Sequence, residues 1–157
     1  MLKLPRALAD AIRRHAERDY PEECCGVLLG RMENENGVRN GDRDGARTVA
    51  EVLPCANAVA RPASHNRYAI APHELIAAQR AARERGLVIA GFYHSHPDHD
   101  AAPSATDTAQ AYWPECVYVI VSVAQGKASE MNAFLLAGNG EARLQPEAIA
   151  ISDRPDW

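Results

Sequence analysis

The stretch of sequence that decides the fold is residues 87–107, LVIAGFYHSHPDHDAAPSATD. It opens with a continuous apolar run, 87–93, which predicts a buried strand. His94 and His96 follow at the end of that run. Residues two apart in a strand point to the same face, so we expect both imidazoles on one side of the sheet. Two imidazoles on one face can bind a single metal ion.

The second half of the stretch adds a carboxylate. After a polar loop at 97–103, a short helix is expected at 104–113. Ser104 is a favourable N-cap residue, and Asp107 suits the first turn. Two imidazole nitrogens and one carboxylate oxygen leave the fourth position of tetrahedral zinc open, which is typical of catalytic zinc. A cap would also aim Asp107 at the metal, so the two interpretations are compatible. The sequence therefore predicts a zinc site made of His94, His96 and Asp107.

Hydrolysis at zinc also needs a group that carries a proton from the attacking water to the leaving amine. Glu22 and Glu23 stand just before an apolar run that predicts a strand at 24–32. They can equally be exposed acids that follow a helix-ending proline, and chemistry alone does not choose between them. Three other acids stay open as the base: Asp98, Asp100 and Glu115.

The rest of the chain predicts a mixed α/β (α+β) sandwich, with a central sheet flanked by helices. The turn-rich segment 33–47 predicts a long, mobile hairpin connection. Its 157 residues fit a single domain, 1–157. Further helices are expected at 5–18 and 72–86, further strands at 48–54, 67–71, 116–123 and 132–137, and an edge strand or tail at 141–151.

Composition narrows the function. The net charge of −4 and the pI near 5.8 give no attraction to nucleic acid or to an anionic membrane. Neither a signal peptide nor a membrane span is evident, so we expect a cytoplasmic protein with reduced thiols. The four cysteines form no C-x-x-C pair and are interpreted as small buried hydrophobic residues. Cys24 and Cys25 are adjacent on a strand and should point to opposite faces.

Two motifs together resemble a known family. Glu23-Cys24-Cys25-Gly26 matches the E-x-C-G element of JAMM (MPN+) domains, and the stretch from His94 to Asp107 matches their H-x-H-x7-S-x2-D element. The chain resembles this zinc metallopeptidase family, in its compact prokaryotic form, along most of its length. The departures are confined to residues 33–47 and the last dozen residues.

The resemblance implies a JAB/MPN fold, related to that of cytidine deaminases. It also implies Zn²⁺ on His94, His96 and Asp107, with Glu23 as general base and then general acid. Ser104 would donate a hydrogen bond to the oxyanion. The activity implied is hydrolysis of a peptide or isopeptide bond after the C-terminal Gly-Gly of a ubiquitin-like β-grasp or sulfur-carrier protein. Because relatives with this fold commonly pair, the resemblance also implies a homodimer.

We expect the Gly-Gly tail to lie in a groove beside an edge strand near Tyr68. His65, Asn66 and Arg67 are candidates to line that groove, although an ordinary loop fits this segment equally well. His99 is expected to be an exposed loop histidine. Tyr112 and Trp113 are expected to pack the short helix onto the sheet.

Two alternative functions stay open. One is a non-catalytic MPN interaction module, although all five matched positions are intact. The other is a RadC-like, DNA-associated protein, which shares an H-x-H-P…S-x-x-D motif. The chain lacks the helical DNA-binding segment expected at the N-terminus of that group, and its charge balance is acidic.

Overall fold

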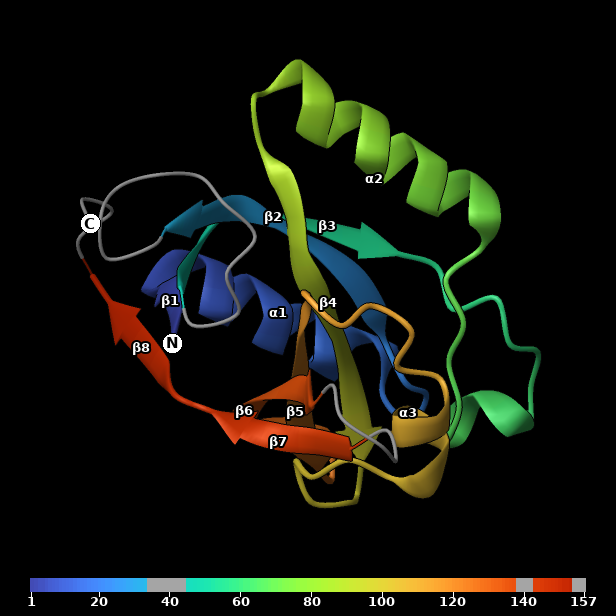
Figure 1. The fold of residues 1–157 in the computed structure, drawn as a ribbon. Coiled ribbons are helices and arrows are strands. Elements are labelled where there is room, and N and C mark those ends of the chain that lie inside the picture. Colours follow the sequence, from blue (N-terminus) through green and yellow to red (C-terminus); the bar gives the residue numbers. More distant parts are fainter. Residues whose placement is uncertain (34–44, 138–142, 154–157) are drawn as a thin grey trace.

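A computed structural model of the chain describes residues 1–33, 45–137 and 143–153. Within them the strands form one eight-stranded mixed sheet in the order β7-β6-β5-β4-β2-β3-β1-β8 (Figure 1). The strands are β1 (Leu2–Pro5), β2 (Cys25–Glu33), β3 (Ala46–Cys55), β4 (Val88–Pro97), β5 (Val117–Ala124), β6 (Lys127–Ala137), β7 (Arg143–Glu147) and β8 (Ile149–Ser152). The helices are α1 (Arg6–Asp19), α2 (Pro72–Glu84) and α3 (Ala105–Ala109), with a 3-10 turn at Ala63–His65.

The sheet curls around α1. Strands β7 and β8 follow each other in the chain, separated by Ala148 alone, yet they form opposite edges of the sheet. The two edges must therefore approach each other, and the concave face that results holds α1 (Figure 1). Ala9, Ile12 and Ala16 of that helix are fully buried in the core on this side.

Helix α2 covers part of the other face. Its Ala78 and Ala82 are buried against Val27 of β2 and Phe92 of β4. The helix begins with Pro72, which is favourable in a first turn. It ends just before Gly86, whose φ of +64° is one that glycine adopts without steric cost. The expected helices at 5–18 and 72–86 are thus confirmed to within two residues.

The central strands β2 and β4 are antiparallel neighbours, with Cys25 opposite His94. Strand β4 also pairs in parallel with β5. Because side chains alternate along β2, Leu28 faces the α1 core and Val27 faces the α2 core. The expected mixed sheet with flanking helices is confirmed, and its centre is the strand that carries both histidines.

The prediction of a strand at 67–71 was wrong. This segment is extended but belongs to no strand, because the side chain of Asn57 takes the place of a partner strand. Its Nδ2 donates to the carbonyl of Arg67 at 2.9 Å, and its Oδ1 accepts from the N–H of Ala69 at 3.2 Å. A side-chain amide offers the same donor and acceptor as a peptide group.

Other boundaries also differ. The helix expected at 104–113 ends at Ala109, and Tyr112 beyond it is 76% exposed, so Tyr112 does not pack a helix onto the sheet. The segment expected as one edge strand or tail at 141–151 contains two strands, β7 and β8. Strand β1 was not predicted, and its Leu4 is buried in the core.

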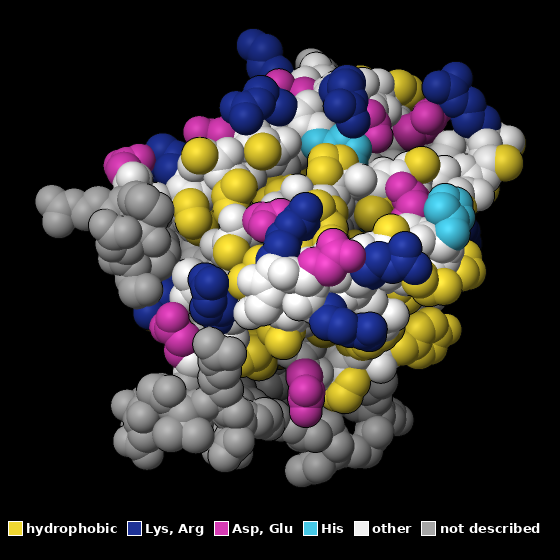
Figure 2. All heavy atoms as spheres, turned by 90° about the horizontal axis from the view of Figure 1, so that it is seen from above, with side chains coloured by type: hydrophobic (Ala, Val, Ile, Leu, Met, Phe, Trp, Pro, Cys, Tyr) yellow, Lys and Arg dark blue, Asp and Glu magenta, His cyan; other side chains and the backbone are white. Residues whose placement is uncertain are grey.

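The turn-rich part of segment 33–47 lies at 34–44, outside the described residues, but its flanks pair as a hairpin does, with Glu33 opposite Ala46. On the side where α2 lies, basic, acidic and hydrophobic side chains are interspersed (Figure 2). Among the described residues, no helix combines the length and the apolar character that crossing a membrane requires.

Candidate metal centre

His94 and His96 lie at the end of β4 with their Nε2 atoms 3.1 Å apart. The expectation that a spacing of two residues places both imidazoles on one face is therefore confirmed. Both side chains are buried. The ring of Tyr68 stacks on His94 with a centroid separation of 4.4 Å, which fixes the plane of that imidazole.

Asp107 reaches the two histidines from the first turn of α3. Ser104 and Asp107 form a capping box: Ser104 Oγ accepts from the Asp107 N–H at 3.0 Å, and Asp107 Oδ2 accepts from the Ser104 N–H at 2.8 Å. The Asp107 carboxylate lies 3.2 Å from His94 Nε2 and 3.0 Å from His96 Nε2. The expected cap and the expected approach to the histidines therefore occur together.

These three side chains fit one tetrahedral ion. Zinc bonds of about 2.0 Å imply ligand atoms roughly 3.3 Å apart, because that is the edge of the corresponding tetrahedron. The two Nε2 atoms are 3.1 Å apart, close to this edge. Asp107 lies at a similar distance from each imidazole, with Oδ1 3.2 Å from His94 and Oδ2 3.0 Å from His96. His96 Nδ1 lies 2.7 Å from the carbonyl of Asp100 and donates to it, so Nε2 carries the lone pair that a metal needs.

Glu23 completes the cluster from the segment just before β2. Its side chain is buried, and its Oε1 lies 3.9 Å from His96 Nε2. Ligand atoms of Glu23, His94 and His96 all lie within 4.8 Å of one another. Glu23 Oε2 is buried without a hydrogen-bond partner among the described residues. A buried carboxylate oxygen in that state fits a group that serves a water or a substrate.

Burial and the neighbouring charges separate the protonation behaviour of these groups. Burial raises the pKa of Glu23 to about 8. Burial also lowers the pKa of His94. For His96, burial alone would lower the pKa, but hydrogen bonds with Asp107 and the Asp100 carbonyl raise it. Burial would raise the pKa of Asp107, yet hydrogen bonds from both histidines hold it well below its usual range. Asp107 is thus the ionised member of the cluster, and Glu23 is the member that holds a proton near neutral pH.

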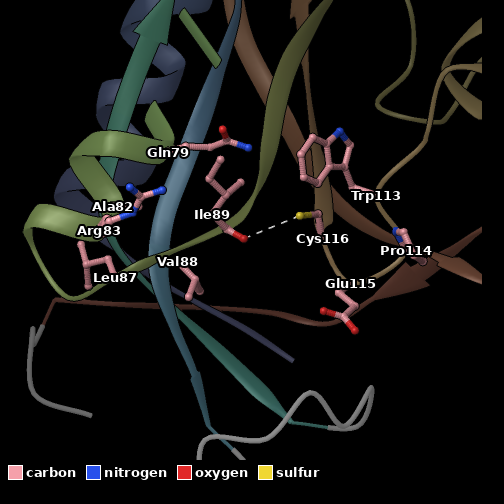
Figure 3. A pocket seen from close by; sticks show the side chains of 10 residues that line it. All are labelled: Gln79, Ala82, Arg83, Leu87, Val88, Ile89, Trp113, Pro114, Glu115 and Cys116. Carbon is pink, nitrogen blue, oxygen red and sulfur yellow. Dashed lines mark hydrogen bonds between the residues drawn. The ribbon is translucent and has the colours of Figure 1, made fainter. Parts of the chain in front are cut away.

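The structure places three of the four rival acids away from the histidines, namely Glu22, Asp98 and Glu115. Glu22 forms an ion pair with Arg61. Asp98 accepts hydrogen bonds from the hydroxyl of Tyr20 and the N–H of Gln125. Glu115 lines a cavity of about 590 Å³ between α2, the start of β4 and the segment before β5 (Figure 3), and neither His94 nor His96 lines that cavity.

A cleft of about 400 Å³ opens onto the cluster. Asp100 reaches this cleft, but its structural role is through its carbonyl, which accepts from His96. His99 is exposed there, as expected. The cleft is lined by Glu23, Asn66, Arg67, His96, His99, Asp100, Ala102, Ser104 and Thr106.

A neighbouring apolar groove of about 300 Å³ runs past the extended segment at 68–70. Trp113 lines it and tilts against Phe92, with ring centroids 5.8 Å apart, so this tryptophan packs against the sheet. It does not pack the short helix onto the sheet as predicted, because that helix ends at Ala109. Of the residues expected to line a tail groove, Tyr68 lies in this groove, and Asn66 and Arg67 lie in the cleft. His65 is exposed and contacts the carbonyl of Pro62.

Sequence reasoning missed the residues that support the site. Ser122 Oγ and Asn132 Nδ2 donate at 2.6 and 3.0 Å to the carbonyls of His99 and Ala101, on either side of the carbonyl that accepts from His96. Asn57 holds the carbonyls of both Glu23 and Arg67. Of these residues, only Ser122 could have been noticed in the sequence, because it is a polar residue inside the apolar run of β5.

The thiols take no part in this chemistry. Cys24 and Cys25 belong to the cores on opposite sides of the sheet, as expected from adjacent strand positions. Burial raises the pKa of Cys24 to about 12 and raises that of Cys25 further. Neither side chain is therefore a nucleophile at neutral pH.

A curled mixed sheet that presents two histidines and an aspartate beside a buried glutamate defines the class of metal-dependent hydrolases. Comparison with known proteins specifies the family. Residues 5–137 match the prokaryotic homologues of the JAB domain, and the chain belongs to that family.

Named relatives agree with this assignment. The chain is 39% identical over 125 residues to a desampylase from Haloferax volcanii (77% of this chain, 80% of that protein). It is 31% identical over 144 residues to a probable TtuB-protein conjugate cleaving protease from Thermus thermophilus (92% and 82%). It is 31% identical over 127 residues to a CysO-cysteine peptidase from Mycobacterium tuberculosis (81% and 77%). A solution structure of a Desulfitobacterium hafniense protein superposes with a TM-score of 0.78 at 28% identity (98% and 94%).

Proposed function

We propose that this chain is a zinc peptidase that hydrolyses the peptide or isopeptide bond after the C-terminal Gly-Gly of a ubiquitin-like β-grasp or sulfur-carrier protein. Its family and the names of its relatives make it a hydrolase of the JAMM type. The observation that carries the zinc assignment is the set of three short separations among His94, His96 and Asp107, with Glu23 buried beside them. Its cytoplasmic location and its pairing as a homodimer stay predictions.

His94, His96 and Asp107 would hold the ion. When bound, Zn²⁺ supplies a hydroxide nucleophile at neutral pH. Glu23 accepts the proton of the attacking water and passes it to the leaving amine. Burial raises the pKa of Glu23 to about 8, and a proton carrier works best when its pKa is near the working pH.

Ser104 would stabilise the charge that develops on the substrate. Its Oγ already accepts the N–H of Asp107, which leaves the hydroxyl hydrogen free to donate. A donor placed at the mouth of the cleft can bind the carbonyl oxygen of the scissile bond as that oxygen becomes negative.

The test is cleavage of a β-grasp sulfur-carrier protein that is extended by two residues beyond Gly-Gly, followed by intact mass. Three samples are compared: wild type, Glu23→Ala, and wild type treated with a chelator. We expect a mass loss after Gly-Gly in untreated wild type alone. Loss of a general acid–base group should lower the rate by roughly 10²–10⁴-fold.

Zinc content separates the roles of the side chains. Glu23→Ala should keep stoichiometric zinc and lose turnover, whereas His96→Ala should lose both. Unchanged turnover in Glu23→Ala would contradict the assignment of the base. Stoichiometric zinc without cleavage of any Gly-Gly fusion would contradict the proposed activity and favour a binding module.

A further inference from the structure

Arg67 places a positive charge in the cleft beside the proposed base. The side chain is exposed and lines the cleft together with Glu23 and His96. Its Nη1 donates to Thr106 Oγ1 at 2.9 Å. Within the described residues, no carboxylate forms an ion pair with this guanidinium, so its other N–H groups are available to a ligand.

The position of Arg67 is fixed relative to Glu23. Nδ2 of Asn57 donates to the Glu23 carbonyl at 3.1 Å and to the Arg67 carbonyl at 2.9 Å. The far end of the arginine is held by Thr106, the residue before the metal-ligating Asp107. Both ends of Arg67 are therefore attached to segments that build the site.

The direction of the reaction places the leaving group near this charge. Glu23 delivers a proton to the leaving nitrogen in the proposed function, so the leaving residue lies on the Glu23 side of the cleft. A residue joined through its α-amine carries a carboxylate one carbon away from that nitrogen. A lysine joined through its ε-amine carries its backbone several methylenes away, where Arg67 has no anion to bind.

We propose that Arg67 binds the free α-carboxylate of the leaving residue, and that the enzyme thereby prefers a single amino acid, joined by an ordinary peptide bond after Gly-Gly, to a lysine side chain of a protein. The proposal rests on the function proposed above. The planar fork of arginine matches a carboxylate with two parallel hydrogen bonds. Because the ion pair between Arg67 and the carboxylate would be partly open to water, we expect the substrate with a free α-carboxylate to be cleaved about tenfold more efficiently.

The test uses one carrier protein with a single alanine after Gly-Gly, prepared as the free acid and as the C-terminal amide. Wild type should cleave the acid about tenfold more efficiently than the amide. Arg67→Gln should cleave both at the rate that wild type shows with the amide. Arg67→Lys should keep part of the preference, because it keeps the charge and loses the fork. Arg80→Gln, an exposed arginine of α2, is the matched control and should behave as wild type.

Equal rates for acid and amide in wild type would overturn the proposal. An equal loss on both substrates in Arg67→Gln would also overturn it, since that pattern indicates a role through Thr106 or through the charge near Glu23. Binding to the Glu23→Gln protein gives a readout independent of turnover, and the acid should bind more tightly than the amide. If wild type cleaves neither substrate, the proposed function fails, and the binding comparison alone then supports or overturns the carboxylate site.

Discussion

Ser104 caps helix α3 and is also the proposed hydrogen-bond donor to the oxyanion. The cap affects stability and the donor affects the reaction rate, so two measurements can separate the two roles. Ser104→Ala removes the hydrogen bond to the Asp107 N–H, which as a lost helix cap should cost about 1 kcal/mol of stability. It also removes the proposed donor to the oxyanion, which should lower kcat by roughly 10²–10³-fold. Thermal unfolding and turnover, measured on the same samples, check both expectations.

The matched variant for this test is Ser104→Thr, which keeps a hydroxyl at the cap. It should retain most of the stability and most of the turnover. The loss of about 1 kcal/mol from the helix cap corresponds to a factor of about five. If turnover in Ser104→Ala falls by no more than this factor, the proposed hydrogen bond from Ser104 to the oxyanion is contradicted.

Gly26 shows why a glycine stands in the E-x-C-G element. It lies opposite Tyr93, the residue before the first histidine, and a Cβ at this position would lie 2.2 Å from the Tyr93 ring. The ring has no room to move, because it is fully buried and its hydroxyl lies 2.7 Å from Nδ1 of His15. Gly26→Ala should therefore destabilise the protein by about 1–3 kcal/mol in urea unfolding.

A double-mutant cycle isolates this contact. In a Tyr93→Ala background, the cost of Gly26→Ala should fall to a few tenths of a kcal/mol, because the clashing ring is gone. An unchanged cost in that background would show that backbone conformation, not the ring, requires the glycine.

At the scale of elements, the loop between β4 and α3 sets the tautomer of His96. Its three successive carbonyls at 99–101 accept hydrogen bonds from β5, β4 and β6, and the middle one receives the His96 Nδ1–H. Asn132→Ala should release the loop and weaken zinc binding by roughly 10–100-fold, as loss of such supporting groups does in other zinc sites. Competition with a chromophoric chelator measures this.

Ser129→Ala is the control for that experiment. Ser129 is exposed on the same strand, β6, and bonds to the carbonyl of Ser122 without touching the loop. It should leave zinc affinity unchanged. Equal zinc affinity in Asn132→Ala and wild type would show that the loop holds its carbonyls without β6.

The sequence predicts best those features that depend on interactions between residues close together in the chain. The approach of the two histidines and Asp107 to one another was predicted correctly, because strand periodicity and a helix cap act over a few residues. The choice of Glu23 over Glu22 needed the resemblance, since its burial depends on distant contacts, such as its N–H donating to the carbonyl of Ser64. The extended segment at 67–71 was misassigned because one side chain, Asn57, replaces a strand.

At the scale of the whole molecule, the buried thiols predict alkaline destabilisation. Burial raises the pKa of Cys24 and Cys116 to about 12 and that of Cys55 to about 11, from an ordinary value of 9.0. A raised pKa means that the unfolded chain loses these protons first. The stabilisation that the protonated thiols give to the folded protein is therefore complete below pH 9. It is lost as the pH rises through the pKa values of the thiols in the folded protein. Between pH 9 and 10, each thiol should lower the unfolding free energy by up to about 1.4 kcal/mol.

Urea unfolding at pH 8, 9 and 10 with a reductant present measures this effect. Cys55→Ala should reduce the slope between pH 9 and 10 by the share of one thiol. A free energy of unfolding that stays flat from pH 8 to 10 would show that the thiols ionise in the folded protein as easily as in the unfolded chain.

The order of the strands has a consequence for biosynthesis. Strand β1 leaves the ribosome before the other described strands, and one of its edges is covered in parallel by β8, which follows all of them. At roughly 5–20 residues per second, the nascent chain exposes that edge for many seconds. The residues of the proposed metal centre, 23 to 107, are all translated before β8. A nascent chain can therefore bring the proposed metal ligands together while the β1 edge is still open to chaperones or to another chain.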